Sequence, residues 1–170
     1  DLQNRDLPCF VLELLRDHDL PARNLVLEIT EQAVVRDFQR ATLVLECLRD
    51  LGIRIAIDDF GTGYSSLAQI KHLPVDELKI DRSFVMDLPG NDDDAAIVRA
   101  SIDLAHNLGL EVLAEGVETQ PALEWLQAQG CEQAQGFLIS KPMPAEQFSA
   151  WVRSHERDET QPGTVLRIAS

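Results

Sequence analysis

The chain has 170 residues, 45% of them hydrophobic, which suits a single globular domain with a core of its own. Its formal net charge of −14 argues against binding to nucleic-acid polymers, because such binding relies on Lys and Arg to neutralise phosphates. A smaller anionic partner would need help from bound cations. No run reaches the roughly 20 apolar residues of a membrane span, and no signal-peptide pattern opens the chain. We therefore expect a cytoplasmic protein, although a longer parent can be membrane-anchored.

The first third of the chain predicts two helices with a strand between them. Apolar residues keep helical spacing over Leu7–Arg16, and Pro21 ends that pattern. The segment Leu25–Glu31 predicts a strand that carries Glu28 near its carboxyl end. A second helical pattern covers Asp37–Leu51 and is followed by a glycine, which suits the position just past a helix end.

The stretch Ile53–Leu67 is the one around which the chain is organised. Its apolar, β-branched start predicts a strand, which stops at two adjacent carboxylates, Asp58 and Asp59, before a Gly-Thr-Gly loop. Such a pair repels itself unless a cation lies between the carboxylates or one of them takes up a proton, so it predicts a divalent metal site. Ordinary turn chemistry, with Asp accepting local backbone hydrogen bonds, is the alternative.

The rest of the chain continues the alternation of helices and strands. We predict strands at Glu77–Asp81, Leu110–Glu115 and Cys131–Gly136, and helices at Ser66–His72, Asp94–Leu108, Pro121–Gln129 and Ala145–Arg153. The polar residues after the last helix predict a linker or a loosely held extension. We therefore divide the chain into a domain over residues 1–153 and a tail over residues 154–170.

Every predicted strand ends in a polar side chain that could take part in binding or catalysis: Glu28, Asp58 with Asp59, Lys79, Glu115 and Gln135. Helices alternating with short apolar strands predict right-handed βα units and a parallel sheet. Functional residues at the carboxyl ends of successive strands favour an α/β fold of the TIM-type (β/α) barrel class. An open flavodoxin-like sheet is the alternative, but its site draws on the switch-point loops. The strands number about five of the eight in a barrel, so we expect a barrel that is incomplete at its amino end.

Several other residues need an interpretation of their own. Lys79 is either a site residue or a surface lysine whose stem lies against the sheet. Arg54 and Glu111 are expected to face solvent or neighbouring helices. The cysteines are expected to be reduced packing residues, and the tryptophans to pack in the core or an interface: Cys9, Cys47, Cys131, Trp125 and Trp151.

Five motifs occur in an order shared with a known family: Glu28-Ile-Thr-Glu31, Asp58-Asp-Phe-Gly-Thr-Gly-Tyr-Ser-Ser-Leu67, Leu78-Lys-Ile-Asp81, Ala114-Glu-Gly-Val-Glu118 and Gln135-Gly-Phe-Leu-Ile-Ser-Lys-Pro142. On these motifs, residues 1–153 resemble the carboxyl-terminal two thirds of an EAL domain, the bacterial cyclic-di-GMP phosphodiesterase module. The resemblance implies a modified TIM barrel that hydrolyses one phosphodiester bond of cyclic-di-GMP to give linear pGpG. It also implies a two-metal site for Mg²⁺ or Mn²⁺, hard cations that prefer oxygen ligands.

The resemblance assigns roles to individual residues. The metal-binding carboxylates are matched by Glu28, Asp58, Asp59 and Glu115, with Asp59 serving the second metal. Lys79 matches a lysine that contacts the hydrolytic water and the phosphate, and Glu115 also matches a base or water-orienting group. Supporting or substrate-contacting positions are matched by Glu31, Ser65, Glu118 and Gln135. Of these, Glu31 is expected to steady the loop over residues 60–66.

The chain departs from the family pattern in its ligand set and at one aromatic position. The Glu-Ala-Leu signature, the Arg soon after it and an Asn metal ligand have no counterpart among the 170 residues, and Phe137 replaces a more usual Tyr. Each lost ligand opens the metal coordination, so we expect weak or no hydrolysis by this chain alone.

The resemblance implies cyclic-di-GMP as the ligand and a sensory or GGDEF domain fused to this one in a longer parent. A non-catalytic module that senses cyclic-di-GMP or dimerises in bacterial signalling is the alternative function. An incomplete barrel leaves unpaired strand edges near Leu25–Thr30 and in the last strands, so we also expect a homodimer.

Overall fold

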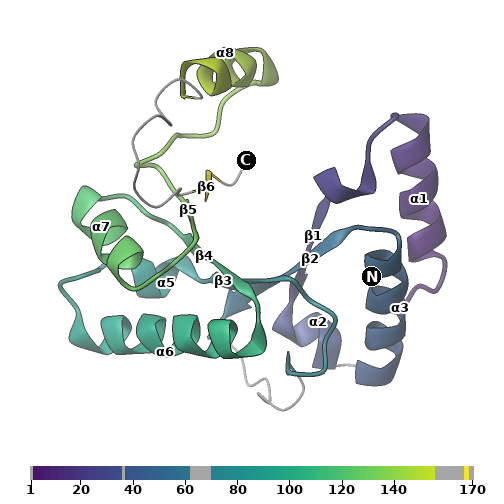
Figure 1. Ribbon diagram of the computed structural model, residues 1–170, viewed down its shortest axis with the longest axis horizontal. Helices are drawn as coiled ribbons and strands as arrows, with labels where there is room; N and C mark the ends of the chain where they lie inside the picture. The colour runs from purple at the N-terminus through teal and green to yellow at the C-terminus, as the bar shows by residue number, and fades with distance from the viewer. Residues whose placement is uncertain (1, 36, 62–69, 156–166, 169–170) are drawn as a thin grey trace.

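A computed structural model describes residues 2–35, 37–61, 70–155 and 167–168 of the protein (Figure 1). Its centre is a parallel sheet in which every strand pairs with the next one along the chain. The strands are β1 (Val26–Thr30), β2 (Arg54–Phe60), β3 (Glu77–Ile80), β4 (Glu111–Glu115), β5 (Gln133–Gln135) and β6 (Arg167–Ile168). This is the strand order of a TIM-type barrel wall. The wall is partial, because β1 and β6 are its two edges and do not pair with each other among the described residues.

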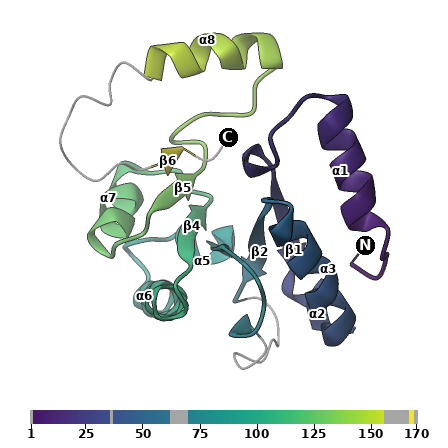
Figure 2. The same ribbon diagram turned by 45° about the vertical axis from the view of Figure 1, so that its right-hand side comes forward.

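Helices flank the sheet (Figure 1). They are α1 (Leu7–Asp17), the 3₁₀ turn η1 (Ala22–Asn24), α2 (Glu31–Val35), α3 (Phe38–Asp50), α5 (Arg82–Val85), α6 (Asp92–Leu108), α7 (Gln120–Ala128) and α8 (Ala145–His155). Helix α3 packs on β2, and α6 packs on β3 and β4. Helix α8 stands apart from the sheet, after the segment that follows β5 (Figure 1). In Figure 2, α1, α2 and α3 stand beside β1 and β2, whereas α6 and α7 stand beside β4 and β5. Within the described ranges, no helix combines the length and hydropathy that a membrane crossing requires.

Helix α6 shows how local sequence sets these elements. The Asn91 side chain caps its start by accepting two backbone N–H groups of the first turn, at 3.0 and 3.3 Å. Gly109 ends it in the left-handed conformation with a φ of 76°, which glycine adopts without steric cost. Val98, Ile102 and Ala105 recur at helical spacing and are at most 1% exposed, so they form the face that packs on the sheet.

The core lies between the sheet and these helices. Strand side chains supply much of it, and several are at most 1% exposed: Ile55, Ile57, Leu78, Ile80 and Val112. Burying a side chain of this size stabilises the fold by about 1.5–3 kcal/mol. The packed strands form a rigid base that fixes the direction of the polar residues at their carboxyl ends.

Apart from the predicted helix Ser66–His72, the predicted elements are present with small shifts of their bounds, and the structure adds four short ones: η1, α2, α5 and β6. Helices α2 and α5 follow β1 and β3, and β6 pairs with β5 inside the predicted tail, so among the described residues the edge expected in the last strands lies at β6. A strand of two residues has no periodicity to predict it. The predicted helix Ser66–His72 falls mainly in residues 62–69, outside the described part of the chain. The division at residue 153 stays a prediction.

The expectation for Arg54 and Glu111 holds in part: their side chains are 34% and 40% exposed, but they pair with each other across the sheet and not with a helix. The Arg54 Nη2 atom lies 2.7 Å from Glu111 Oε2 and 3.4 Å from Glu77 Oε2. Gln133 Nε2 donates to the same two carboxylate oxygens, at 2.9 Å for Glu77 and 3.0 Å for Glu111. A polar cluster from β2 to β5 thus closes the amino-terminal end of the sheet.

All three cysteines are free thiols, as expected, but the expectation that they pack in the interior holds for one of them. Cys131 is buried, and its Sγ atom donates to the Gln133 carbonyl oxygen at 3.2 Å. Burial raises the pKa of the Cys131 thiol to about 12. Cys9 and Cys47 are exposed instead, because their helices turn those positions away from the sheet.

Candidate functional site

The carboxyl ends of β1 to β4 bring four charged side chains to one point. Glu28 comes from β1, Asp58 from β2, Lys79 from β3 and Glu115 from β4. The Lys79 Nζ atom lies 2.7 Å from Glu28 Oε1, 2.9 Å from Asp58 Oδ1 and 2.7 Å from Glu115 Oε1. The structure therefore gathers four of the predicted site residues, which are far apart in sequence, into one cluster.

Lys79 is not a surface lysine, since it is only 3% exposed. Burial alone would lower the pKa of Lys79, but hydrogen bonds to Glu115, Glu28 and Asp58 outweigh burial and raise that pKa above its ordinary value. Lys79 is thus a buried cation that offsets the mutual repulsion of its three carboxylate neighbours.

Asp59 joins this cluster through an irregularity in β2. Successive residues of a regular strand point to opposite faces, so Asp58 and Asp59 would ordinarily diverge. Asp59 has a φ of 55°, and the register between β2 and β3 shifts between Ile57 and Phe60. Such bulges re-aim side chains and are over-represented beside active sites. As a result, one oxygen each from Asp58, Asp59 and Glu115 lie within 4.8 Å of one another.

The residues at this point fit a hard divalent cation. All of the donor atoms are carboxylate oxygens, which Mg²⁺ and Mn²⁺ prefer. Asp58 Oδ1 is buried, and its contact among the described residues is the Lys79 ammonium group, 2.9 Å away. The Lys79 cation already offsets the cost of burying this oxygen, so the fit to a metal rests on the convergence of the three carboxylate oxygens. Asp58, Asp59 and Glu115 are therefore the residues best placed to hold a metal, with Glu28 next to them.

Asp81 is an acidic neighbour that the sequence analysis did not single out as a site residue. Desolvation, followed by the negative charges of Asp58 and Asp81, raises the pKa of Asp59. Desolvation acts in the same direction on Asp81, but hydrogen bonds, chiefly from Ser83, outweigh it and lower the pKa of Asp81. One of these bonds is the backbone N–H of Ser83, which donates to Asp81 Oδ1 at 2.9 Å. The signal for Asp81 was its position two residues after Lys79, since such residues share a strand face.

The structure places the four predicted supporting residues differently. Glu31 is 8% exposed and its Oε1 atom accepts the Gly61 N–H at 3.3 Å, where a residue that steadies this loop would act. Gln135 is paired in register with Glu115 but is itself exposed. Glu118 is exposed, and no described ion pair joins it to the Lys79 cluster. Ser65 lies outside the described residues.

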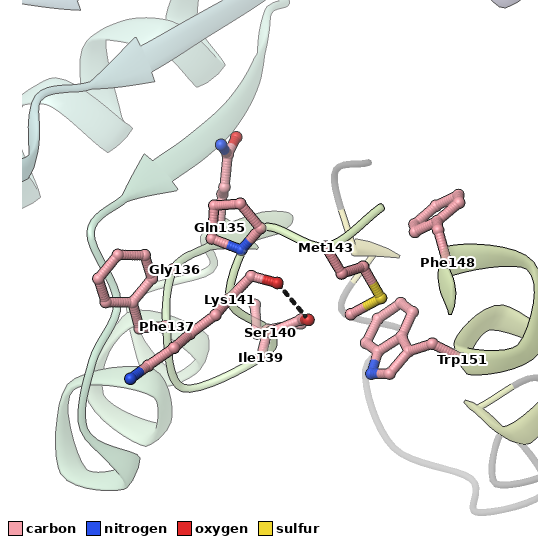
Figure 3. A pocket seen from close by; sticks show the side chains of 10 residues that line it. Gln135, Gly136, Phe137, Ile139, Ser140, Lys141, Met143, Phe148 and Trp151 are labelled. Carbon is pink, nitrogen blue, oxygen red and sulfur yellow. Dashed lines mark hydrogen bonds between the residues drawn. The ribbon is translucent and has the colours of Figure 1, made fainter. Parts of the chain in front are cut away.

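A pocket of about 230 Å³ opens beside Gln135 (Figure 3). Its walls come from the segment after β5 and from α8, including Phe148 and Trp151, whose stacked rings are 6.1 Å apart. The segment passes close to the loop after β4, because a Cβ atom on Gly136 would collide with the backbone of Val117. Trp151 is thus partly buried, stacks on Phe148 of the same helix and lines this pocket.

Comparison with known proteins agrees with the motifs and the fold. The model of the EAL domain family matches residues 1–142. The chain belongs to the EAL domain family. It is 51% identical over 139 residues to MucR of Pseudomonas aeruginosa, a bifunctional diguanylate cyclase/cyclic di-GMP phosphodiesterase. It is 44% identical over 159 residues to NbdA of the same organism, a cyclic di-GMP phosphodiesterase. The matches cover 82% and 94% of this EAL chain but 20% of each relative, so the chain spans about a fifth of their length.

Solved EAL structures confirm the partial-barrel fold. MucR phosphodiesterase in complex with cyclic-di-GMP superimposes with a TM-score of 0.82 at 47% identity, covering 86% of this chain and 60% of that one. BlrP1 of Klebsiella pneumoniae, in complex with manganese and cyclic-di-GMP, gives a TM-score of 0.75 at 36% identity, covering 82% of this chain and 36% of that one. The EAL fold has thus been solved together with a divalent cation and cyclic-di-GMP.

Proposed function

We propose that this EAL chain forms the acidic part of the active site of a metal-dependent phosphodiesterase that hydrolyses cyclic-di-GMP to linear pGpG. The observation that carries the proposal is the convergence of Glu28, Asp58 and Glu115 on Lys79, with the Asp59 carboxylate beside them. The cluster lies at the carboxyl ends of the strands, the face where TIM barrels perform catalysis. The relatives that carry the name cyclic di-GMP phosphodiesterase support the choice of substrate.

The residue types suit this reaction. A phosphodiester is anionic and repels both hydroxide and bare carboxylates. Two Mg²⁺ or Mn²⁺ ions, when bound, would lower the pKa of a water molecule and neutralise the phosphate. Asp58, Asp59, Glu115 and Glu28 would hold these ions. Lys79 would donate hydrogen bonds to the phosphate and the water, and Glu115 would orient the water or accept its proton.

We further propose that the parent protein carries additional domains and that the chain alone turns over slowly. The bifunctional name of MucR, of which this chain matches 20%, supports a sensory or GGDEF domain in the parent. Slow turnover follows from the ligand set, since the family's Glu-Ala-Leu glutamate and Asn ligand have no counterpart among these 170 residues.

A single-turnover assay tests the proposal in spite of slow catalysis. The chain is held in molar excess over cyclic-di-GMP with Mn²⁺, and the nucleotides are separated by reversed-phase chromatography. We expect linear pGpG to accumulate, to disappear with EDTA and to be lost in Glu115→Gln. Glu46→Gln, an exposed position on α3, is the matched control and should behave as the wild type. Cyclic-di-GMP that binds the wild type but stays intact would contradict hydrolysis and favour the sensing alternative.

A further inference from the structure

Lys79 shares its carboxylate neighbours with the group that is placed to hold a metal. The Nζ atom contacts Glu28, Asp58 and Glu115 at 2.7, 2.9 and 2.7 Å. The oxygens that could hold a cation come from Asp58, Asp59 and Glu115. Asp58 and Glu115 belong to both sets, so an incoming cation and the ammonium group compete for the same two side chains.

The ammonium group has no spare capacity while these contacts persist. An ammonium group carries three N–H donors, and Lys79 has three carboxylate neighbours on three different strands. The side chain is also 4% exposed, so water does not take the place of these contacts. Lys79 must therefore leave at least one carboxylate before it can donate to a phosphate.

A buried ammonium group at this point has the same electrostatic effect as a bound metal ion. Carboxylates this close repel one another strongly in a poorly hydrated site, and a positive charge between them reduces that repulsion. The four strands that carry the cluster lie next to one another in the sheet (Figure 1), so the ammonium group also ties their carboxyl ends together.

We propose that Lys79 is a built-in substitute for the metal: it holds the carboxylates in place while the site is metal-free, and a binding metal displaces it toward the phosphate. This inference rests on the proposed metal-dependent function. Lys79 acts on the site by positioning the ligands before it acts on the substrate. The alternative is a permanent structural ion pair, which metal binding would leave unchanged.

Metal affinity distinguishes a displaceable Lys79 from a permanent structural ion pair. If Lys79 competes with the metal, removing its charge tightens metal binding; if it only supports the site, removing it weakens metal binding. Mn²⁺ is titrated into the wild type and into Lys79→Met by calorimetry, with Lys79→Arg to keep the positive charge and Lys141→Met as an exposed control. We expect Lys79→Met to bind Mn²⁺ about tenfold more tightly or better, and the other two variants to stay near the wild-type affinity. In EDTA, Lys79→Met should have the lower melting temperature, and Mn²⁺ should raise it by more than it raises that of the wild type. Equal or weaker Mn²⁺ binding by a folded Lys79→Met would overturn the proposal.

A measurement on the wild type covers the case in which Lys79→Met does not fold. The chain has three lysines, Lys71, Lys79 and Lys141, so a ¹⁵N-lysine spectrum of the ammonium groups is simple to assign. We expect one protected Nζ signal in EDTA that shifts and loses protection as Mg²⁺ saturates the protein, while the other two stay unchanged. A Lys79 signal that is unchanged at Mg²⁺ saturation would overturn the proposed displacement of Lys79 and leave the proposed function untouched. A wild type that binds neither Mg²⁺ nor Mn²⁺ would instead overturn the proposed function and this inference together.

Discussion

Replacing Arg54 with methionine tests the polar cluster at the amino-terminal end of the sheet. Methionine keeps much of the apolar stem but removes the charge that lies 3.4 Å from Glu77 Oε2 and 2.7 Å from Glu111 Oε2. Glu77 is 5% exposed, so hydration of its carboxylate cannot replace the lost interaction with Arg54. The variant therefore leaves a buried negative charge without its cationic partner.

The size of the effect follows from burial. Breaking a fully buried ion pair costs about 3–5 kcal/mol, because the remaining charge stays desolvated. The Arg54 side chain is 34% exposed, so solvent screens part of that loss. Gln133 Nε2 also still donates to Glu77 Oε2 at 2.9 Å. We therefore expect Arg54→Met to lower the free energy of unfolding by about 1.5–3 kcal/mol near neutral pH.

The loss should depend on pH in a direction set by Glu77. Burial raises the pKa of Glu77 above its ordinary value, although Arg54 and Gln133 act in the opposite direction. A carboxyl group whose pKa is higher in the folded state favours the fold at low pH, and that contribution disappears as pH rises through the folded-state pKa. Without Arg54 the folded-state pKa rises further. The destabilisation should therefore be larger at about pH 8 than at about pH 5, because a lower pH favours the protonated, neutral form of Glu77.

Urea unfolding followed by circular dichroism measures this at both pH values. Glu77→Gln provides the second side of a double-mutant cycle, because the amide has the same shape without the charge. In that background, Arg54→Met should cost less than about 1 kcal/mol at either pH. Arg5→Met, at an exposed position, is the control and should change little. An equal loss at both pH values, or an unchanged loss in the Glu77→Gln background, would refute this reasoning.

Three other predictions concern packing, thiol reactivity and assembly. Gly136→Ala should lower the free energy of unfolding by about 1–3 kcal/mol in thermal melts, because its Cβ meets the backbone, whereas Gly90→Ala should not; equal melting temperatures would contradict this. Native protein should be alkylated at Cys9 and Cys47 and protected at Cys131, as read by mass spectrometry, and rapid labelling of Cys131 would show that it is not buried. The free edge of β1 should support a homodimer, so light scattering should give twice the 19.0 kDa chain mass, and a monomer at high concentration would count against it.

Local pattern was enough for most of the elements and for their order. Helix starts and ends depend on nearby residues, such as the cap at Asn91 and the stop at Gly109, so they can be read from sequence. The polar residues at strand ends were equally visible, and parallel pairing of successive strands placed Glu28, Asp58, Lys79 and Glu115 at one end of the sheet. The short strand β6 was missed because a pairing of two residues leaves no periodic signal.

Local sequence pattern did not predict the interaction partners of each charged residue. Arg54 and Glu111 were expected to meet solvent or helices, yet they meet each other from strands β2 and β4. The Asp58–Asp59 pair predicted a shared metal site, but the backbone that permits it was not predicted: Asp59 has a φ of 55°, whereas regular alternation along a strand would point the two side chains apart. That conformation accompanies a shift in the β2–β3 register, which involves residues distant in sequence.

By itself, then, the sequence determined the alternating helices and strands, the family and the kinds of residue at the strand ends, because backbone periodicity and motif spacing are local properties. Only the tertiary structure decided that Lys79 is buried among three carboxylates, that Asp81 lies near Asp59, and that the amino-terminal charges form one cluster. Those arrangements depend on which strands become neighbours and how far water is excluded between them, and both are set by the packing of the whole sheet.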